Sequence, residues 1–461
     1  MSRVHADQTD FSKGSVGRVI LNQSLPLMAA QLIHLLYNIV DRIFIGHMPG
    51  DVGTIALTGF GLAFPLTTII AAFTNLFSSG GAPLFAIARG EKNETKAELI
   101  LNQVMMLLTV SSIIMTIFCY AFRRPILYLF GASDVSYPYA NTYLKIYLVG
   151  TVFTMISTGM NSFINAQGYP RHGMITVASG AFINLVLDPI FIYIFHMGVA
   201  GAALATVISQ AVSFLWVMWF FYSDITLYHF KAELWKPDGK LIREISTLGL
   251  TGFIMQGTNS LVQIVCNVTL RTWGGDLYVG VMTVINSVRE VLSMPCQSIT
   301  QGSQPVISYN YGARNYTRIR ASIKFSTLLA GVYTLLAWTV VVLFPRQLMS
   351  IFTPDESLIT TGARALSIYF FGFVFMTLQF AGQSTFTALR CVKRAVFFSL
   401  FRKVLIVVPL TILLPQMGFG VTGVYMAEPI SNLVGGAVSF ITMVLTVYRK
   451  LPQTDGEPAY F

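Results

Sequence analysis

Long apolar runs separated by short polar segments form the main pattern of this sequence. A helix needs about 20 consecutive apolar residues to cross the hydrocarbon core of a membrane, and the runs reach that length. The pattern therefore predicts an all-α membrane protein with twelve transmembrane helices. The runs lie at about 20–46, 53–78, 98–121, 139–163, 172–195, 199–222, 245–271, 277–303, 322–344, 363–387, 395–415 and 421–447.

Composition supports a membrane protein and excludes several other classes. The 461 residues are 54% hydrophobic and 11% charged, whereas a soluble domain carries about 25% charged residues. An ordinary cytosolic enzyme, a disordered chain and a coiled coil are therefore excluded. The net charge of +10 does not indicate nucleic-acid binding, because the basic residues form short clusters between the apolar runs rather than one continuous face.

The distribution of lysine and arginine predicts the orientation in the membrane. Most of them lie in the N-terminal arm, in the tail and in the alternate loops 88–98, 164–171, 223–243, 312–324 and 390–403. The opposite loops hold only Arg123, Arg124, Arg271, Arg346 and Arg364. Because basic loops stay on the cytoplasmic side, we expect a multi-pass protein of the cell (inner) membrane with both termini in the cytoplasm. Residues 1–17 are polar and show no cleavable signal sequence, so we expect the first span to act as its own insertion signal.

The two halves of the chain repeat each other at an offset of about 222 residues. Segment 90–96 (GEKNETK) matches segment 312–318 (GARNYTR), and the step from Pro189 to Gly198 matches that from Pro409 to Gly418. Each half holds six helices, so both insert with the same orientation, and a pseudo-two-fold axis along the membrane normal should relate them. The predicted domains are an N-terminal lobe at 1–222, a cytoplasmic linker at 223–243 and a C-terminal lobe at 244–461.

Polar residues inside the apolar runs are the candidates for function, because an ionisable group in hydrocarbon costs a few kcal/mol or more. The first span carries one polar stripe at helical spacing, and the seventh span carries a corresponding one. We predict that both stripes line a substrate cleft; the alternative is that their amides and histidine bond neighbouring helices. The stripes contain Gln31, His34, Tyr37, Asn38 and Asp41 in the first span and Gln256, Asn259, Gln263 and Asn267 in the seventh.

The fifth span carries a second carboxylate. Asn184 and Asp188 are four residues apart and share a helix face, and Pro189 follows directly. Proline removes a backbone donor and frees a carbonyl for other partners. Asp41 and Asp188, with amide and hydroxyl oxygens nearby, suit either a proton or Na⁺ as a coupling ion, since both ions are held by oxygen atoms. The alternative is a pairing of Asp41 with a basic residue.

The C-terminal half has polar residues of its own inside the spans. Arg289 and Glu290 lie in the eighth span and Glu428 in the twelfth. Arg289 suits a structural ion pair or a substrate contact, and Glu428 is a candidate second anionic contact for a cationic substrate. We also predict that Glu290 and amides of the fourth and tenth spans line the cleft. These amides are Asn161, with Asn165, and Gln383, with Gln379.

Sequence signatures of enzymes are absent. The chain has no HExxH, GxxxxGK[ST], GxSxG or GxGxxG motif, and it has no soluble segment long enough to bind ATP. We therefore expect no enzymatic activity, no ATP-driven transport by this chain alone, and no cofactor other than a coupling ion, H⁺ or Na⁺.

Several short segments carry a family resemblance over essentially the full length of the chain. They are DRIFIG at 41–46, NAQG at 165–168, LDP at 187–189 and GVAGAA at 198–203. Together with the two six-helix repeats, they make the chain similar to the multidrug and toxic compound extrusion (MATE) family. The resemblance implies two lobes that export organic cations in exchange for H⁺ or Na⁺. It also implies a cation-coupling site in the N-terminal lobe, with possible Na⁺ ligands at Asp41, Asn184, Asp188 and Thr206.

We therefore expect a secondary-active multidrug efflux antiporter that works by alternating access. Its expected partners are small hydrophobic or cationic compounds and the lipid bilayer, without nucleic acid, and the expected state is a monomer. The main alternative is a lipid-linked saccharide flippase, which should carry several basic residues in its cleft to meet a pyrophosphate; only Arg42 and Arg289 qualify here. A non-transporting receptor or scaffold is the alternative from another class.

Overall fold

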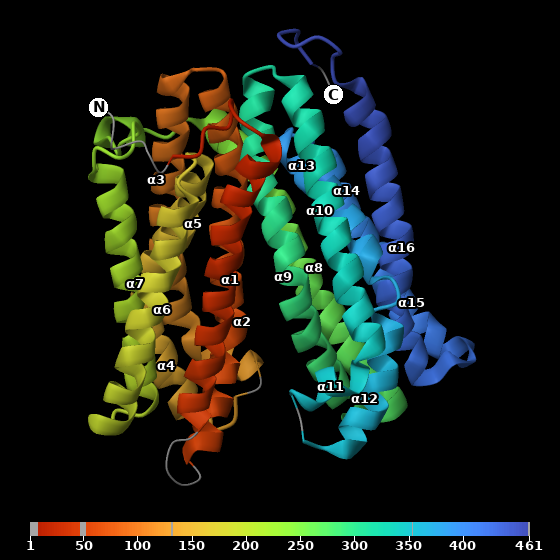
Figure 1. The fold of residues 1–461 in the computed structure, drawn as a ribbon. Coiled ribbons are helices and arrows are strands. Elements are labelled where there is room, and N and C mark those ends of the chain that lie inside the picture. Colours follow the sequence, from red (N-terminus) through yellow and green to blue (C-terminus); the bar gives the residue numbers. More distant parts are fainter. Residues whose placement is uncertain (1–7, 47–51, 131, 353, 460–461) are drawn as a thin grey trace. The chain divides into compact units, whose positions relative to one another are not determined.

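The computed structural model describes residues 8–46, 52–130, 132–352 and 354–459, and none of these lies in a strand (Figure 1). Each of the twelve predicted spans coincides with one helix or with consecutive helices, so the predicted all-α membrane class is confirmed. By length and composition alone, seven described helices qualify as membrane spans, or up to eight if a pair bent by 48° counts as one span.

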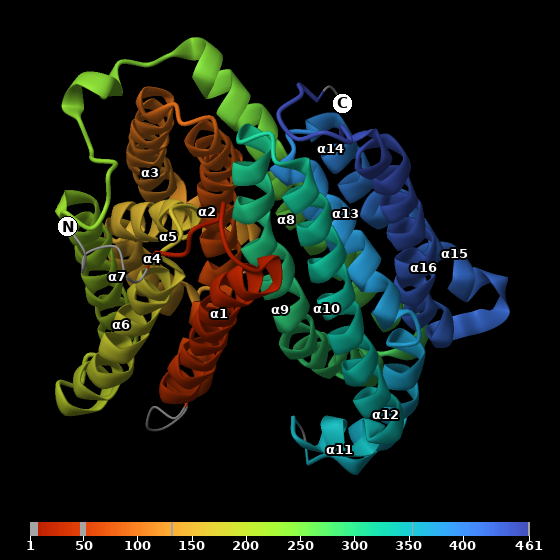
Figure 2. The same cartoon turned by 45° about the horizontal axis from the view of Figure 1, so that its top comes forward.

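The first half of the chain supplies most of one compact unit, which comprises the described residues up to Thr9, Ala29–Arg89 and Asn93–Gly249. Within it, α3 packs on α4 and α5, and α7 packs on α4, α5 and α6 (Figure 2). The elements are α1 (Val16–Gly46), α2 (Val52–Gly90), α3 (Glu94–Leu129), α4 (Tyr137–Val149), α5 (Thr151–Ala166), α6 (Pro170–Pro189), the π-helix η1 (Ile190–Ile194), α7 (Val199–Tyr222) and the 3₁₀-helix η2 (Ala232–Trp235).

The second unit comprises Asp10–Met28, Gly90–Lys92 and Leu250–Phe461. Its elements are α8 (Gly239–Gly274), α9 (Asp276–Gly312), α10 (Tyr316–Leu343), α11 (Pro345–Ser350), α12 (Glu356–Tyr369), η3 (Phe373–Phe375), α13 (Met376–Ala388), α14 (Val392–Leu400), η4 (Phe401–Val407), α15 (Val408–Leu414), η5 (Pro415–Phe419), α16 (Gly420–Thr446) and η6 (Tyr448–Lys450).

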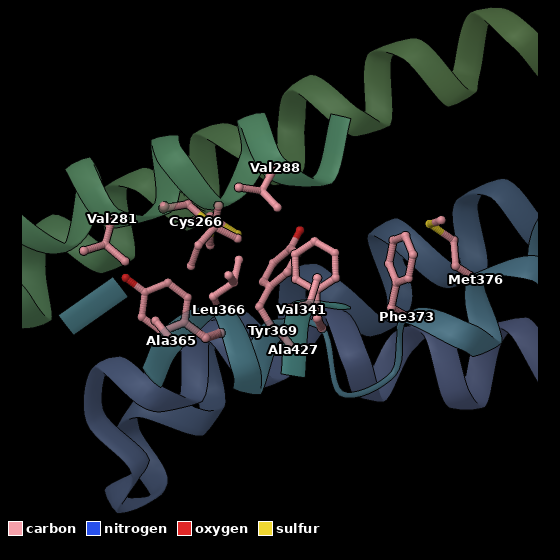
Figure 3. Packing of buried hydrophobic residues seen from close by; sticks show 14 of the residues in the cluster. Cys266, Val281, Val288, Val341, Ala365, Leu366, Tyr369, Phe373, Met376 and Ala427 are labelled. Carbon is pink, nitrogen blue, oxygen red and sulfur yellow. The ribbon is translucent and has the colours of Figure 1, made fainter. Parts of the chain in front are cut away.

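A buried apolar cluster lies at the centre of the second unit and is shared by α8, α9, α10, α12 and α16 (Figure 3). It includes Cys266, Val288, Tyr369 and Ala427. Lipid tails are as apolar as these side chains, so close packing rather than exclusion from water holds the helices together. Gly436 of α16 illustrates this packing, because a Cβ there would lie 2.7 Å from the carbonyl oxygen of Phe375.

The boundary between the two units falls inside three helices. It crosses α1 between Met28 and Ala29, α8 between Gly249 and Leu250, and the last residue of α2, between Arg89 and Gly90. The domain limits drawn from the sequence, with lobes at 1–222 and 244–461, remain a prediction.

The segment predicted as a linker is held to α3 by two buried amides. Gln103 donates to the carbonyl oxygens of Leu234 and Lys236, both at 2.7 Å. Asn102 accepts from the backbone N–H of Lys231 at 2.8 Å and donates to the carbonyl oxygen of His229 at 3.1 Å. Such contacts satisfy backbone groups that a loop would otherwise present to water.

The internal repeat is visible in the backbone. Four pairs of residues with positive φ lie 222 positions apart: Lys92 and Arg314, Gly168 and Arg390, His196 and Gly418, and Gly198 and Gly420. The sequence comparison paired Gly198 with Gly418, but its structural counterpart is Gly420. The difference arises because the C-terminal half has two fewer residues before its proline and two more after it.

Candidate functional site

The site is built on α1 and on the end of α6, both in the first unit. Pro189 ends α6, and the chain continues as the π-helix η1. Proline has no N–H to offer the helix, and single π-helical turns are frequent at functional sites. On the turn before this break, Asn184 and Asp188 are 1% and 0% exposed.

Asp41 and Asp188 bring two carboxyl groups together. Asp41 is buried, and its carboxyl lies close enough to that of Asp188 for the two to share a proton. Asn184 donates from Nδ2 to Asp188 Oδ1 at 3.3 Å. The buried Asp188 Oδ2 receives no hydrogen bond from the residues that the structure describes. The pair therefore keeps acceptor capacity for a proton or a cation.

Tyrosines surround this carboxyl pair. Tyr37 of α1 lies within electrostatic range of both acids. Tyr143 of α4 is likewise a neighbour of Asp41, and its ring stacks on that of Tyr147 with centroids 5.9 Å apart. Phenol groups can donate hydrogen bonds to carboxylates while their rings keep water out.

Thr206 of α7 is linked to the pair through Tyr143. It is buried, and its hydroxyl donates to the carbonyl oxygen of Ala202 at 3.0 Å. The Tyr143 hydroxyl contacts the same side chain. The four residues predicted for cation coupling are therefore all buried in one unit. Thr206 lies beside Tyr143, which in turn lies beside Asp41, so Thr206 is a neighbour of the Asp41–Asp188 carboxyl pair.

Chemically, two carboxyl groups in contact cannot both carry a charge at low energy without a proton or a cation between them. Among the described side chains, Asp188 forms no ion pair with a basic residue. Carboxylate, amide and hydroxyl oxygens are the ligands that hard cations prefer. The arrangement suits reversible uptake of H⁺ or of Na⁺.

The polar stripe of α1 is partly exposed and bonded along the helix. Asn38 donates to the carbonyl oxygen of His34 at 2.7 Å and lies 3.2 Å from its Nδ1. The rings of His34 and Tyr37 are 5.2 Å apart, edge to face. Gln31 is half-buried, and His34 is exposed. Whether this stripe lines a substrate path stays a prediction.

The residues predicted for the cleft in other helices fall into two groups. Asn259, Gln263 and Glu290 are exposed, and Gln256 is half-buried. Asn161 and Gln383 instead lie in helix interfaces. A Cβ on Gly173 of α6 would lie 2.9 Å from Asn161 Oδ1.

The side-chain amide of Gln383 on α13 donates hydrogen bonds to a neighbouring helix of the second unit. It donates to the carbonyl oxygen of Ala395 at 3.1 Å and to Ser399 Oγ at 2.9 Å. Both acceptors lie on α14. Such amide bonds between helices are the alternative that sequence reasoning had left open for the polar residues.

The idea that Glu428 serves as an anionic contact for a cationic substrate is wrong for this structure. Glu428 accepts hydrogen bonds from Arg402 Nη1 at 3.0 Å and from Lys403 Nζ at 3.1 and 3.4 Å. Arg289 Nη1 lies 3.8 Å from the same Oε1 atom. A carboxylate that three cations already face offers no net attraction to a fourth.

Arg402 and Lys403 were counted with the cytoplasmic loop 390–403, and this was wrong. They lie in η4, inside the helical span that begins at Val392, and both are largely buried. Their signal in the sequence was two adjacent basic residues within an apolar run. The tyrosines of α4 gave a weaker signal, because Tyr143 and Tyr147 share a face at i, i+4 spacing.

A repeated set of apolar helices, with a buried carboxyl pair in one half, defines a polytopic membrane protein of the transporter type. Residues 26–190 and 253–413 match the MatE family. These segments cover most of the chain, and the chain therefore belongs to the MatE family.

Relatives and solved structures agree with this assignment. The multidrug export protein MepA of Staphylococcus haemolyticus is 26% identical over 424 residues, 90% of each chain. MepA of Staphylococcus aureus is 24% identical over 448 residues, 95% of each chain. The outward-facing structure of a multidrug resistance MATE family transporter shares the fold, with a TM-score of 0.89 and 22% identity, covering 98% of this chain and 99% of that one.

Proposed function

We propose that this chain exports hydrophobic, often cationic compounds and that entry of H⁺ or Na⁺ at Asp41 and Asp188 drives the export. The buried contact between these two carboxyl groups carries the proposal, because it offers a place where one ion can bind and leave. Relatives of similar length named multidrug export proteins support the substrate class.

The proposed cycle couples the ion to α1. Ion binding neutralises Asp41 and Asp188, which removes the repulsion that separates α1 from α6. The first helix then repacks near Pro26, which lies inside α1 and leaves one of its backbone carbonyls without a helical donor. The drug site weakens as a result. Thermodynamic linkage requires that drug and ion weaken each other's binding by the same factor.

Ethidium transport in proteoliposomes tests the proposal. Wild type, Asp41→Asn and the control Asp276→Asn, an exposed acid of α9, are compared under an imposed pH gradient and then under a Na⁺ gradient. We expect one gradient to drive wild type and the control, and Asp41→Asn to be slower by at least about tenfold. Transport by Asp41→Asn at the wild-type rate would falsify the proposal.

We also propose that both termini are cytoplasmic and that the chain is a monomer of the inner membrane. The two described ends attach to the end of α9 and the start of α10, which follow each other in the chain, and this supports a common side. Asn310 donates to the Phe11 carbonyl oxygen at 3.1 Å, and Arg320 donates to the Leu451 carbonyl oxygen at 2.6 Å. Tags at either end should become accessible to antibody only after the cells are permeabilised.

The flippase alternative gains one observation from the structure. It requires several basic residues inside the helical bundle, and Arg289, Arg402 and Lys403 come together there. Glu428 accepts hydrogen bonds from Arg402 and Lys403 and offsets part of their charge, and so we keep export as the proposed function. If wild type moves no ethidium under either gradient, a fluorescent lipid-scrambling assay decides for the flippase. No step of the proposed cycle requires enzymatic chemistry or a cofactor.

A further inference from the structure

Two matching pairs of loops in the repeat differ in charge. Segments 312–324 and 390–394 of the second half contain seven lysines and arginines and no aspartate or glutamate. The segments 222 positions earlier, 90–102 and 168–172, contain three lysines and arginines and three glutamates. Because the paired positive φ angles show the same backbone in both halves, the backbone does not require this difference. Only the second half carries an excess of positive charge in these loops.

Two of these arginines hold the ends of the chain without being neutralised. Arg318 donates to three carbonyl oxygens of the N-terminal arm at 2.9 to 3.2 Å. Arg320 donates to the carbonyl oxygens of Leu451 and Pro452 at 2.6 and 3.0 Å. A carbonyl oxygen carries no net charge, and a guanidinium keeps its proton in a protein. Both arginines therefore add to the positive potential at this end of the second unit.

Exposed basic side chains lie around one apolar cluster at the same end. The start of α10, the start of α14 and the end of α16 share this cluster, which includes Phe398 and Val447 (Figure 1). Lys324 of α10, Lys393 of α14 and Arg449 of η6 are exposed. In the part of the chain that the structure describes, none of these three side chains forms an ion pair. Their charge is thus available to a partner.

Two of these basic residues begin an exposed apolar helix face. On α14, Phe397 follows Lys393 by four residues and is 53% exposed. On α10, Leu328 and Val332 follow Lys324 by four and eight residues and are 63% and 51% exposed. Residues four apart share one face of a helix. A phospholipid fits this order, because its phosphate can meet the basic group while its acyl chains lie along the apolar face.

The corresponding positions of the first half have a different character. Counted 222 positions back, Lys324 corresponds to Asn102, which is buried and bonded to the linker. Arg449 corresponds to Leu227. Only Lys393 has a basic counterpart, Arg171. The arrangement of basic residues and apolar faces is therefore particular to the second unit.

We propose that this end of the second unit binds anionic phospholipid of the cytoplasmic leaflet. The lipid phosphate contacts Lys324, Lys393 and Arg449, and the acyl chains lie along Phe397 and Leu328. A zwitterionic lipid has no net charge to offer the basic residues, so the surface selects a lipid with a net negative headgroup. This inference uses the proposed cytoplasmic position of the termini and is independent of the proposed export function.

Native mass spectrometry of the full chain tests the proposal. The chain is equilibrated in detergent micelles with equal amounts of phosphatidylglycerol and phosphatidylcholine that carry the same acyl chains. A basic residue near an anionic surface contributes about fivefold in binding. We therefore expect wild type to bind phosphatidylglycerol at least about tenfold better than phosphatidylcholine. Glutamine at Lys324, Lys393 and Arg449 together should remove most of this preference.

The matched control removes the same number of charges from the first unit. Lys236, Lys240 and Arg243 are exposed there. Glutamine at all three should leave the preference for phosphatidylglycerol unchanged. The thermal midpoint of each variant verifies folding. If the triple variant of the second unit does not fold, the single variant Lys393→Gln decides, with an expected loss of about fivefold.

Three results would overturn the proposal. The first is a wild type that binds both lipids equally. The second is an equal loss in the variant and the control, because net charge rather than this surface would then attract the lipid. The third is displacement of phosphatidylglycerol by an equal concentration of glycerol phosphate, since a free phosphate would then satisfy the site without acyl chains. Tags that prove extracellular would overturn the leaflet assigned here, whatever the lipid preference.

Discussion

Asp41 on α1 and Asp188 on α6 place their carboxyl groups close enough to share a proton, with both side chains buried in the first unit. The second unit lacks this arrangement. Counted from the prolines, the counterpart of Asp188 is Val408, and counted from the glycine pairs it is Leu410. Either way the position is apolar. The two halves thus share a backbone plan but differ in charge, with acids in one and a basic cluster in the other.

Replacing Asp188 by asparagine should separate stability from coupling. Asparagine keeps the shape and removes one of two like charges, so the thermal midpoint should stay the same or rise. Ion-driven ethidium export should fall at least about tenfold. Proteoliposome transport and thermal unfolding of the same samples measure both effects. Asp224→Asn, at an exposed acid, is the control. Export at the wild-type rate by Asp188→Asn would contradict the role of the pair.

The repeated helix caps should contribute equally to stability. Asn93 accepts from the Lys96 N–H at 3.0 Å, and Asn315 accepts from the Arg318 N–H at 3.1 Å, with nearly the same backbone angles. Alanine at either position should lower the free energy of unfolding by about 1 kcal/mol. Asn93→Ser, which retains a cap acceptor, should cost much less. If Asn93→Ala and Asn315→Ala lowered the free energy of unfolding by clearly different amounts, the two caps would not be equivalent.

Loss of one buried amide should release the linker. In Gln103→Leu, the carbonyl oxygens of Leu234 and Lys236 lose their donor. The segment should then open more often, and limited trypsin digestion should cut after Lys231 several-fold faster. Gln347→Leu, at an exposed position far along the sequence, is the control. Unchanged cleavage would mean that other contacts hold the linker.

The cap of α12 predicts a pH dependence of stability. The Ser357 hydroxyl, followed by the N–H groups of Ser357 and Leu358, holds the pKa of Asp355 below its usual value of 3.8. A lowered pKa in the folded state means that the cap stabilises fully above pH 3.8 and loses its effect as the pH falls through the lower value. The difference in thermal midpoint between wild type and Asp355→Ala should persist at pH 5 and shrink near pH 3. A difference that is already lost at pH 5 would contradict the assignment.

The sequence alone predicted the spans and the acids, because both signals are local. Apolar length identifies a membrane helix, and a carboxylate inside one is conspicuous at Asp41 or Asp188. The contact between these acids could not be deduced, since it depends on how α1 packs against α6. The same holds for Glu428, whose partners Arg402 and Lys403 come from another span. The count of basic residues by loop assigned Arg402 and Lys403 to a loop, because both lie near the edge of an apolar run and that edge was taken to lie outside the membrane.

Polar residues in helix interfaces were the least predictable part of the site. Gln383 and the stripe of α1 have similar spacing in the sequence, yet Gln383 bonds α14 while His34 is exposed. Helical periodicity gives the face of a helix but not its neighbour. Only the packed structure separates an amide that joins two helices from one that remains accessible.

Because the boundary between the units runs through α1 and α8, no hinge loop separates them at these two crossings. A hydrogen-bonded helix behaves as a stiff rod over a few turns and carries torque along its axis. Asp41 lies on the same rod as residues 16–28, which belong to the other unit. In the proposed cycle, a charge change at Asp41 therefore acts on a helix that enters the other unit about 20 Å away, at 1.5 Å per residue, and that contains its proline, Pro26, just beyond this point.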